Sequence, residues 1–237
     1  MWTLGRLDPR DLVLVVDDLE LANRSQPHAV CDEVRAALAR HLAGLGRSAP
    51  ALQRLAQAVR TRLSFHLVVP MVESWFFAAP TALTALGLGS VPFHKRPGDP
   101  ESFESTDRNY IEAQPTACTA WCSYGRSKND RPKWIGAGDK RVWHPKGYIQ
   151  WLMIDPSHKT CTRYREGPGG AAPVLAVVDW ASLLGDPATM LYARALVADL
   201  ADGLGQCPAV APWQGNTAGL TSRSQPPGGP PLVLRNL

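Results

Sequence analysis

The sequence predicts an α/β fold in which a mostly parallel sheet is flanked by helices. Three short apolar segments indicate buried strands, at residues 11–17, 65–71 and 172–180. The stretches between and after them carry apolar residues at helical spacing. Strands that alternate with amphipathic helices are typical of a parallel sheet, whose functional crevice lies at the carboxyl ends of the strands.

The first two helices are predicted between the first and second strands. Residues 27–45 carry apolar side chains on one helical face. That face consists of Val30, Val34, Ala37, Leu38, His41 and Leu45. Ser48 followed by Pro50 predicts the start of the next helix, because proline is tolerated in the first helical turn.

The middle of the chain mixes a short helix, an irregular stretch and a longer helix. Pro80 opens a predicted short helix that ends near Gly87. Residues 90–143 lack periodicity and are rich in Pro, Gly and charge, so we expect an irregular insert there. Residues 144–152, HPKGYIQWL, predict a helix with a proline in its first turn.

The last predicted helix is capped by Asp186 with Pro187. Its expected apolar side is formed by Met190, Ala193, Val197, Leu200 and Leu204. We expect residues 1–213 to form a single domain. Residues 214–237 are rich in Pro and Gly and predict a flexible tail.

Composition excludes some classes of protein and favours others. With 237 residues and 45% apolar content, the chain can bury a substantial core. The net charge of +4 gives no global attraction to a polyanion, so such binding would need local clustering. Five irregularly spaced cysteines favour reduced thiols in a cytoplasm, and no signal peptide or membrane span is predicted.

The most informative feature is a group of acids at two strand ends. In the stretch DLVLVVDDLE, the first predicted strand ends at Asp17 and is followed by Asp18 and Glu20. Glu73 follows the second predicted strand. Carboxylates this close repel one another unless a cation lies between them. Mg²⁺ or Mn²⁺ takes such oxygen ligands, so the four acids are candidate metal ligands. The alternative is that they cap a helix or lie in a solvated loop.

A basic, aromatic segment lies at 126–148. It holds seven Lys or Arg against two Asp, with tryptophans between them. Phosphates attract the cations and bases stack on the rings, so this segment predicts nucleic-acid contact. The candidate residues are Arg126, Lys128, Arg131, Lys133, Trp134, Lys140, Arg141 and Trp143. The alternative is a solvated loop whose tryptophans turn inward.

Two residues at the start of the 144–152 helix are catalytic candidates. Lys146 is placed to meet a scissile phosphate or stabilise a leaving oxygen, and His144 precedes it. Each is equally consistent with an ordinary first-turn residue. His66, by contrast, alternates with apolar strand neighbours and is predicted to be a core or edge histidine.

Several segments together resemble a bacterial family of TOPRIM-like proteins, some of them found in phage-defence operons. They are LVLVVDDLE, FHLVVPMVESWFFAAPTAL, HPKGYIQWL and YREGPGGAAPVLAVVDW, within residues 11–205. The resemblance implies a Mg²⁺-dependent nuclease fold and a partner ATPase. Carried over by position, Asp17 with Asp18 or Glu20 matches the acidic strand end. Glu73 with Trp75 matches the Glu-x-Trp segment, and Lys146 the Pro-Lys element.

One element of the TOPRIM pattern has no counterpart. Its proteins begin with a strand that ends in a catalytic glutamate, whereas MWTLGRLDPR contains none. Either Glu73 or Glu20 takes the place of that glutamate, or the start of the sequence is truncated, or the catalytic centre is degenerate. The sequence therefore leaves two hypotheses from different classes. One is a Mg²⁺-dependent nuclease or nuclease-like effector, and the other is a catalytically inactive binding or scaffold subunit.

Overall fold

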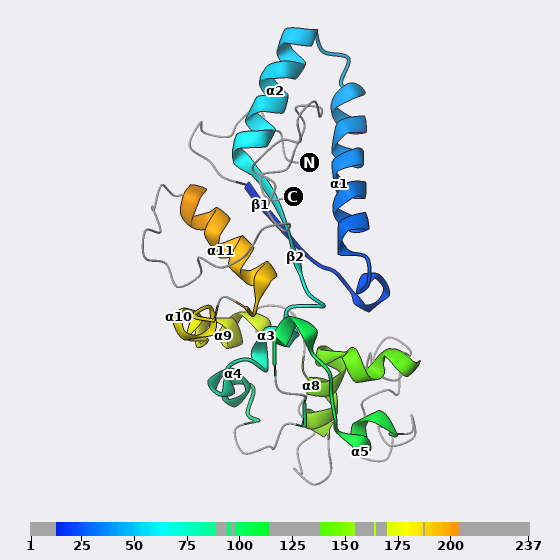
Figure 1. Cartoon of the computed structure of the whole chain (residues 1–237), viewed down its shortest axis with the longest axis vertical. Helices are drawn as coiled ribbons and strands as arrows, with labels where there is room; N and C mark the ends of the chain where they lie inside the picture. The colour runs from blue at the N-terminus through cyan, green and yellow to red at the C-terminus, as the bar shows by residue number, and fades with distance from the viewer. Residues whose placement is uncertain are drawn as a thin grey trace.

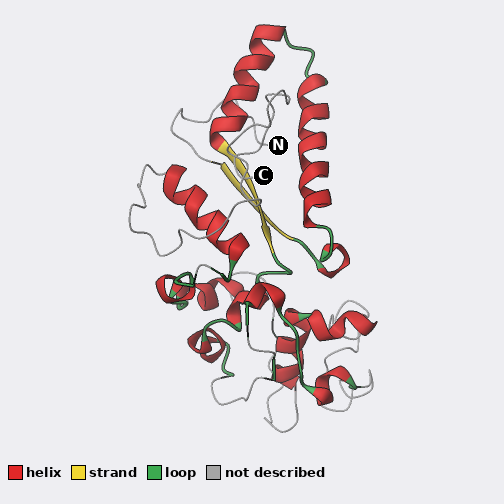
Figure 2. Cartoon of the chain, in the orientation of Figure 1, coloured by secondary structure: helices red, strands yellow, loops and turns green. Residues whose placement is uncertain are grey.

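Two parallel strands form the sheet in the part of the chain that the computed structural model describes. The described residues are 13–88, 94–95, 98–113, 138–154, 164, 170–186 and 188–203. Within them, the protein is a mixed α/β structure with helices around this small sheet (Figures 1 and 2). The expected third strand is absent from these residues, and the predicted tail at 214–237 lies outside them.

Strands β1 (Val13–Asp18) and β2 (Leu63–Val68) pair in parallel, as predicted for the first two strands. The register runs from Val13 opposite Leu63 to Asp18 opposite Val68. Beyond the strands, the backbone N–H of Leu19 donates to the Val68 carbonyl at 2.9 Å, which holds both carboxyl ends together. β2 is buried almost throughout, whereas β1 is largely exposed.

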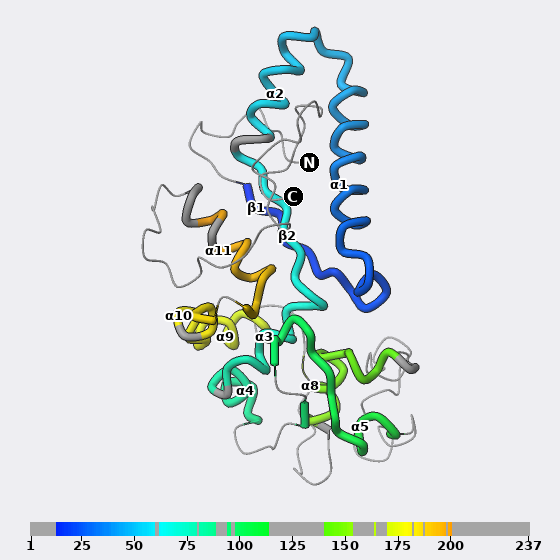
Figure 3. Tube along the Cα trace, in the orientation of Figure 1, coloured from blue at the N-terminus to red at the C-terminus, as the bar shows by residue number. Residues whose placement is uncertain are grey.

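Helices α1 (Pro27–Ala43) and α2 (Ala49–Arg62) connect the two strands and confirm the predicted helical pair. Both carry a proline in the first turn, where the missing N–H costs nothing. The two helices form a hairpin that extends away from the other helices (Figures 1 and 3). In the N-terminal part of α1, Val30, Val34 and Leu38 pack against the β2 side chains Phe65 and Leu67.

The core beyond β2 is aromatic. It is built from α3 (Glu73–Phe76), α4 (Pro80–Ala85), α8 (Pro145–Ile154) and loop residues between them. Phe77 lies 4.8 Å from Phe103 and 5.7 Å from Tyr148, measured between ring centroids, and Tyr110 lies 5.0 Å from Tyr148. Packed ring pairs at these distances stabilise a fold beyond the area that they bury.

Described parts of the predicted irregular insert contribute to this core. They contain the 3₁₀ helices η3 (Pro100–Ser102) and η5 (Gly138–Trp143) and the short helix α5 (Arg108–Ile111). Phe103 and Tyr110 from these segments are fully buried. In these described parts the backbone forms short helices and irregular stretches, as the lack of periodicity predicted, and buried residues from them belong to the core.

The predicted strand at 172–180 is wrong. These residues lie in α9 (Ala171–Ala176), a turn, and the start of α10 (Trp180–Leu183). Short apolar runs do not distinguish a buried strand from a buried helix. Val174 in α9 and Val178 in the connection that follows are both buried in the core. Pro173 also lacks the N–H that a central strand would donate.

The last helix is present, but its predicted cap is wrong. α11 (Leu191–Gly203) begins after Met190, and Asp186 bonds instead to the backbone N–H of Ala188. The first N–H groups of α11 donate to Glu101, through Tyr192 and Ala193 at 2.9 Å each. A carboxylate satisfies helix N-terminal N–H groups well. This carboxylate lies 91 and 92 residues before the two N–H groups, so local sequence could not indicate it.

A buried polar cluster joins β2 to α11. The Ser64 hydroxyl donates to Asp199, and Nε2 of His66 lies 2.9 Å from Ser64 Oγ and 3.3 Å from Asp199 Oδ2. All three side chains are at most 2% exposed. The structure confirms His66 as a core histidine with polar partners. Because these groups have no access to solvent, the cluster stabilises the packing of α11 on the sheet.

We predict that Asp199→Ala lowers the free energy of unfolding by about 3 kcal/mol, because it removes the carboxylate that Ser64 and His66 contact in the core. Asp32→Ala serves as the control, since Asp32 forms only an exposed ion pair with Arg35 and should cost about 0.5 kcal/mol or less. Urea unfolding followed by circular dichroism measures both. Equal losses in the two variants would contradict this role of Asp199.

Candidate functional site

Asp18 lies at the carboxyl end of β1, facing the chain that leaves β2. The backbone N–H of Val72 donates to its Oδ1 at 3.1 Å. Partial burial raises the pKa of Asp18, and the nearby Glu20 and Asp17 charges act in the same direction. The Val72 hydrogen bond and the positive charge of Lys146 oppose this increase. The end of β1 therefore holds a carboxyl group, that of Asp18, with the positive charge of Lys146 nearby.

Asp17 and Glu20 lie beside Asp18 but are placed differently. Successive side chains of a strand point to opposite faces, so Asp17 faces away from Asp18, and its side chain is exposed. Glu20 is also exposed and has a positive φ of 63°, while its N–H donates to the Pro70 carbonyl at 3.0 Å. Of the three acids predicted at this strand end, Asp18 is the one directed toward Glu73.

Glu73 begins α3, five residues after the end of β2. Its side chain is 1% exposed, and the Tyr164 hydroxyl donates to its Oε1 at 2.9 Å. Burial raises the pKa of Glu73, and the Asp18 charge adds to this. The Tyr164 hydrogen bond and the Lys146 charge lower it. The structure thus brings together two carboxylates that the sequence predicted from two different strand ends.

Lys146 lies in the first turn of α8 and supplies the positive charge of this cluster. It lowers the pKa of both Asp18 and Glu73. Contacts between α3 and α8 hold the two short segments next to each other. Tyr164 completes the group, and burial together with the Glu73 charge raises the pKa of its hydroxyl, which stays protonated as a donor. We call Asp18, Glu73, Lys146 and Tyr164 the acidic cluster.

His144 and Arg141 hold the start of α8 in place. His144 is buried, and its Nδ1 accepts the backbone N–H of Gly147 at 3.3 Å, as a helix cap does. Nη1 of Arg141 donates to the carbonyls of Tyr110, Ile111 and Ala113 at 3.1, 2.9 and 2.7 Å. Both residues, predicted for catalysis and nucleic-acid contact respectively, make internal contacts that position the segment carrying Lys146.

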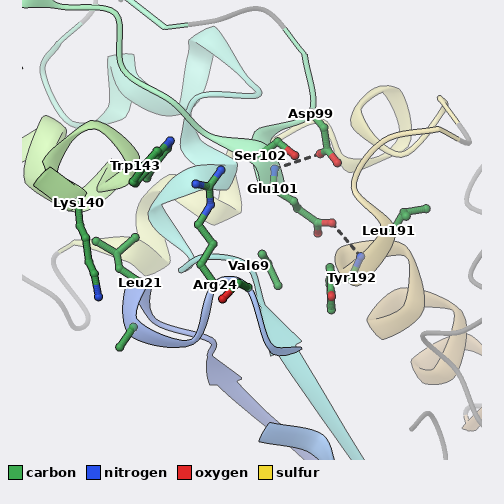
Figure 4. A pocket seen from close by; sticks show the side chains of 12 residues that line it. Leu21, Arg24, Val69, Asp99, Glu101, Ser102, Lys140, Trp143, Leu191 and Tyr192 are labelled. Carbon is green, nitrogen blue, oxygen red and sulfur yellow. Dashed lines mark hydrogen bonds between the residues drawn. The ribbon is translucent and has the colours of Figure 1, made fainter. Parts of the chain in front are cut away.

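The remaining nucleic-acid candidates divide into two groups. Lys140 and Trp143 line a pocket of about 650 Å³, together with Arg24, whose guanidinium lies 4.8 Å from the centroid of the Trp143 ring (Figure 4). The others lie outside the described residues. They are Arg126, Lys128, Arg131, Lys133 and Trp134.

Glu101 forms part of the far wall of the same pocket. Burial raises its pKa to about 7, and the Asp99 charge contributes, while the N–H groups of Tyr192 and Ala193 act in the opposite direction. Asp99 also accepts the N–H of Met190 at 3.0 Å. Sequence reasoning missed Glu101, Arg24 and Tyr164, because each acts through partners distant in the chain. An acid within an irregular segment was the only available signal for Glu101.

Comparison with protein-family profiles, curated protein sequences and solved structures gives no match to this chain. Within the described ranges, no group of three or more His, Cys, Asp or Glu residues is arranged to hold a metal ion. The helices in those ranges also include none with the length and apolar character needed to cross a lipid bilayer. The geometry of the acidic cluster is therefore the basis for any functional argument.

We predict that Glu73→Gln raises the stability of the protein at pH 8. A carboxyl group whose pKa is raised on folding stabilises the native state below its unfolded value near 4.5 and loses that contribution as the pH rises through the folded value. Glutamine removes the buried charge but still accepts the Tyr164 hydrogen bond. Thermal unfolding at pH 8 and pH 4 measures the effect, which should shrink at pH 4. A variant less stable than wild type at pH 8 would contradict the account.

Proposed function

We propose that this protein is a Mg²⁺- or Mn²⁺-dependent enzyme that hydrolyses nucleic-acid phosphodiester bonds, built on a TOPRIM-like fold. The observation that carries the proposal is the convergence of Asp18, Glu73 and Lys146 at the carboxyl edge of two parallel strands. In open α/β sheets this edge is where ligands bind. Two acids and a lysine there match the needs of a metal ion and a phosphate.

The two carboxylates fit a divalent ion. Among contacts with other described residues, Asp18 uses Oδ1 for the Val72 N–H and Glu73 uses Oε1 for the Tyr164 hydroxyl. The second oxygen of Asp18 accepts no hydrogen bond from another described residue and is left for a ligand, whereas the Glu73 carboxyl group also accepts its own backbone N–H. Mg²⁺ is commonly held by one or two carboxylates, with waters and substrate phosphate completing its coordination. When bound, such an ion polarises the phosphodiester and lowers the pKa of a bound water.

The chain's own residues then have distinct roles. Tyr164 holds the Glu73 carboxyl group in one orientation through its hydroxyl. The Lys146 ammonium neutralises phosphate charge, and the contacts of His144 and Arg141 fix the helix start from which it extends. The TOPRIM-like resemblance extends this proposal to a bacterial cytoplasmic protein that acts in phage defence with a partner ATPase.

A second candidate is a non-catalytic binding or scaffold subunit. The near-complete burial of Glu73 beneath Tyr164 favours it, because a metal ligand needs an open approach for substrate. In this case the acidic cluster stabilises the junction between β1, α3 and α8. The two candidates differ in whether the cluster takes up an ion and whether the protein cuts a strand.

We predict that wild type cuts labelled DNA or RNA with Mg²⁺ or Mn²⁺ and is inactive with EDTA. Asp18→Asn and Glu73→Gln should abolish cutting, and Lys146→Gln should reduce it about 100-fold, because each removes charge from the site. Single- and double-stranded substrates of both nucleic acids are compared by gel electrophoresis. Asp32→Asn, an isosteric change at an exposed acid of α1, is the matched control.

Thermal unfolding with and without Mn²⁺ separates the two candidates. An increase in melting temperature that disappears in Asp18→Asn, without cutting of any substrate, would indicate a non-catalytic subunit that holds an ion. Neither cutting nor stabilisation by Mn²⁺ would refute the proposed enzyme. Cutting that persists in both acid variants would place the catalytic centre elsewhere in the chain.

A further inference from the structure

A second concave site lies next to the acidic cluster and is not used by the proposed hydrolysis. It is the pocket of about 650 Å³ between η2 (Leu21–Asn23), η3, η5 and the start of α11. Val69, immediately after β2, contributes to its lining and places it beside the carboxyl edge of the sheet. This volume is within the range of pockets that hold small ligands.

One side of the pocket carries two cations and an aromatic ring. Figure 4 shows Arg24 beside Trp143 and Lys140 on the same side of the pocket, across from Glu101 and Asp99. The guanidinium carbon of Arg24 lies over the Trp143 ring, 4.8 Å from its centroid, which is a cation–π contact. Neither Arg24 nor Lys140 forms an ion pair with any other residue that the structure describes.

The carboxylates across the pocket are hydrogen-bonded to backbone groups and form no ion pair with these cations. Both oxygens of Glu101 accept backbone N–H groups of α11, from Tyr192 and Ala193. Oδ1 of Asp99 accepts the N–H groups of Glu101 and Met190, each at 3.0 Å. The two acids keep their charge but are held at the helix start, so the N–H groups of Arg24 and Lys140 are not engaged by them. Ser102, an exposed residue of the pocket lining, offers its hydroxyl as a polar contact for a sugar.

Apart from Ser25 and Tyr192, the rest of the lining is apolar. Leu21 and Leu191 border the pocket together with the ring of Trp143. A ligand that satisfies both parts has a planar apolar group and an anionic group a short distance away. A simple inorganic anion would leave the apolar surface uncovered, and an apolar ligand would leave the two cations without a partner.

We propose that this pocket binds a nucleoside phosphate, with the phosphate at Arg24 and Lys140 and the base against the apolar part of the lining. The ligand is a free nucleotide or one nucleotide unit of a single strand, since both present the same phosphate, sugar and base. This binding requires no divalent ion and is independent of the proposed hydrolysis, so either proposal can fail without the other.

Isothermal titration calorimetry of the full chain with 5′-AMP, in buffer that contains EDTA, tests the proposal. We expect AMP to bind, and adenosine and inorganic phosphate each to bind at least about tenfold more weakly, because each satisfies only one part of the pocket. Arg24→Gln and Lys140→Gln should each weaken AMP binding about tenfold. Arg47→Gln, at an exposed arginine in the α1–α2 connection, is the matched control and should bind as wild type does.

A 5′-phosphorylated single-stranded oligonucleotide distinguishes the two sources. Tighter binding of the oligonucleotide than of AMP would assign the pocket to a strand, and equal or weaker binding would assign it to a free nucleotide. The proposal is overturned if neither probe binds, or if Arg24→Gln and Lys140→Gln bind both probes as tightly as wild type.

Discussion

Glu73 carries an ionisable group into a position where only 1% of its side chain is exposed, and the surrounding structure accommodates this burial. An isolated buried carboxylate is costly because it loses its hydration. Here the Tyr164 hydroxyl and the Lys146 charge replace part of that hydration, while Asp18 adds a second negative charge nearby. The resulting arrangement holds acids with raised pKa values at a sheet edge, which is a frequent property of functional sites.

The Lys146 charge lies near Asp18 and Glu73 because the segment before Lys146 is anchored in the core. Arg141 donates to the carbonyls of Tyr110 and Ile111 in α5 and of Ala113 just after it, and the Tyr110 hydroxyl donates back to the Arg141 carbonyl at 3.0 Å. His144 then caps the first turn of α8. Arg141, which the sequence assigned to a nucleic-acid surface, thus acts in the described structure as a support for Lys146. A site held by such anchored elements keeps its geometry better than one on an unsupported loop.

Strand-end reasoning predicted that Asp17 or Asp18 pairs with Glu73, because acids that follow neighbouring parallel strands meet at one edge. The same reasoning could not separate Asp17 from Asp18, since the direction of each side chain depends on the pairing register. Contacts over long sequence separations were also not predictable. The Tyr164 hydroxyl on Glu73 and the Glu101 cap on α11 leave no local pattern. The incorrect strand at 172–180 shows the further ambiguity of short apolar runs.

The central claim is that Asp18, Glu73 and Lys146 form one electrostatically coupled site. Carboxyl-carbon NMR titration of the two acids in wild type and Lys146→Met tests it most directly. Removing the lysine charge should raise the pKa of both acids, because that charge favours their ionised forms. Lys140→Met, at a lysine on the neighbouring pocket, is the control. Unchanged pKa values of Asp18 and Glu73 in Lys146→Met would contradict the account.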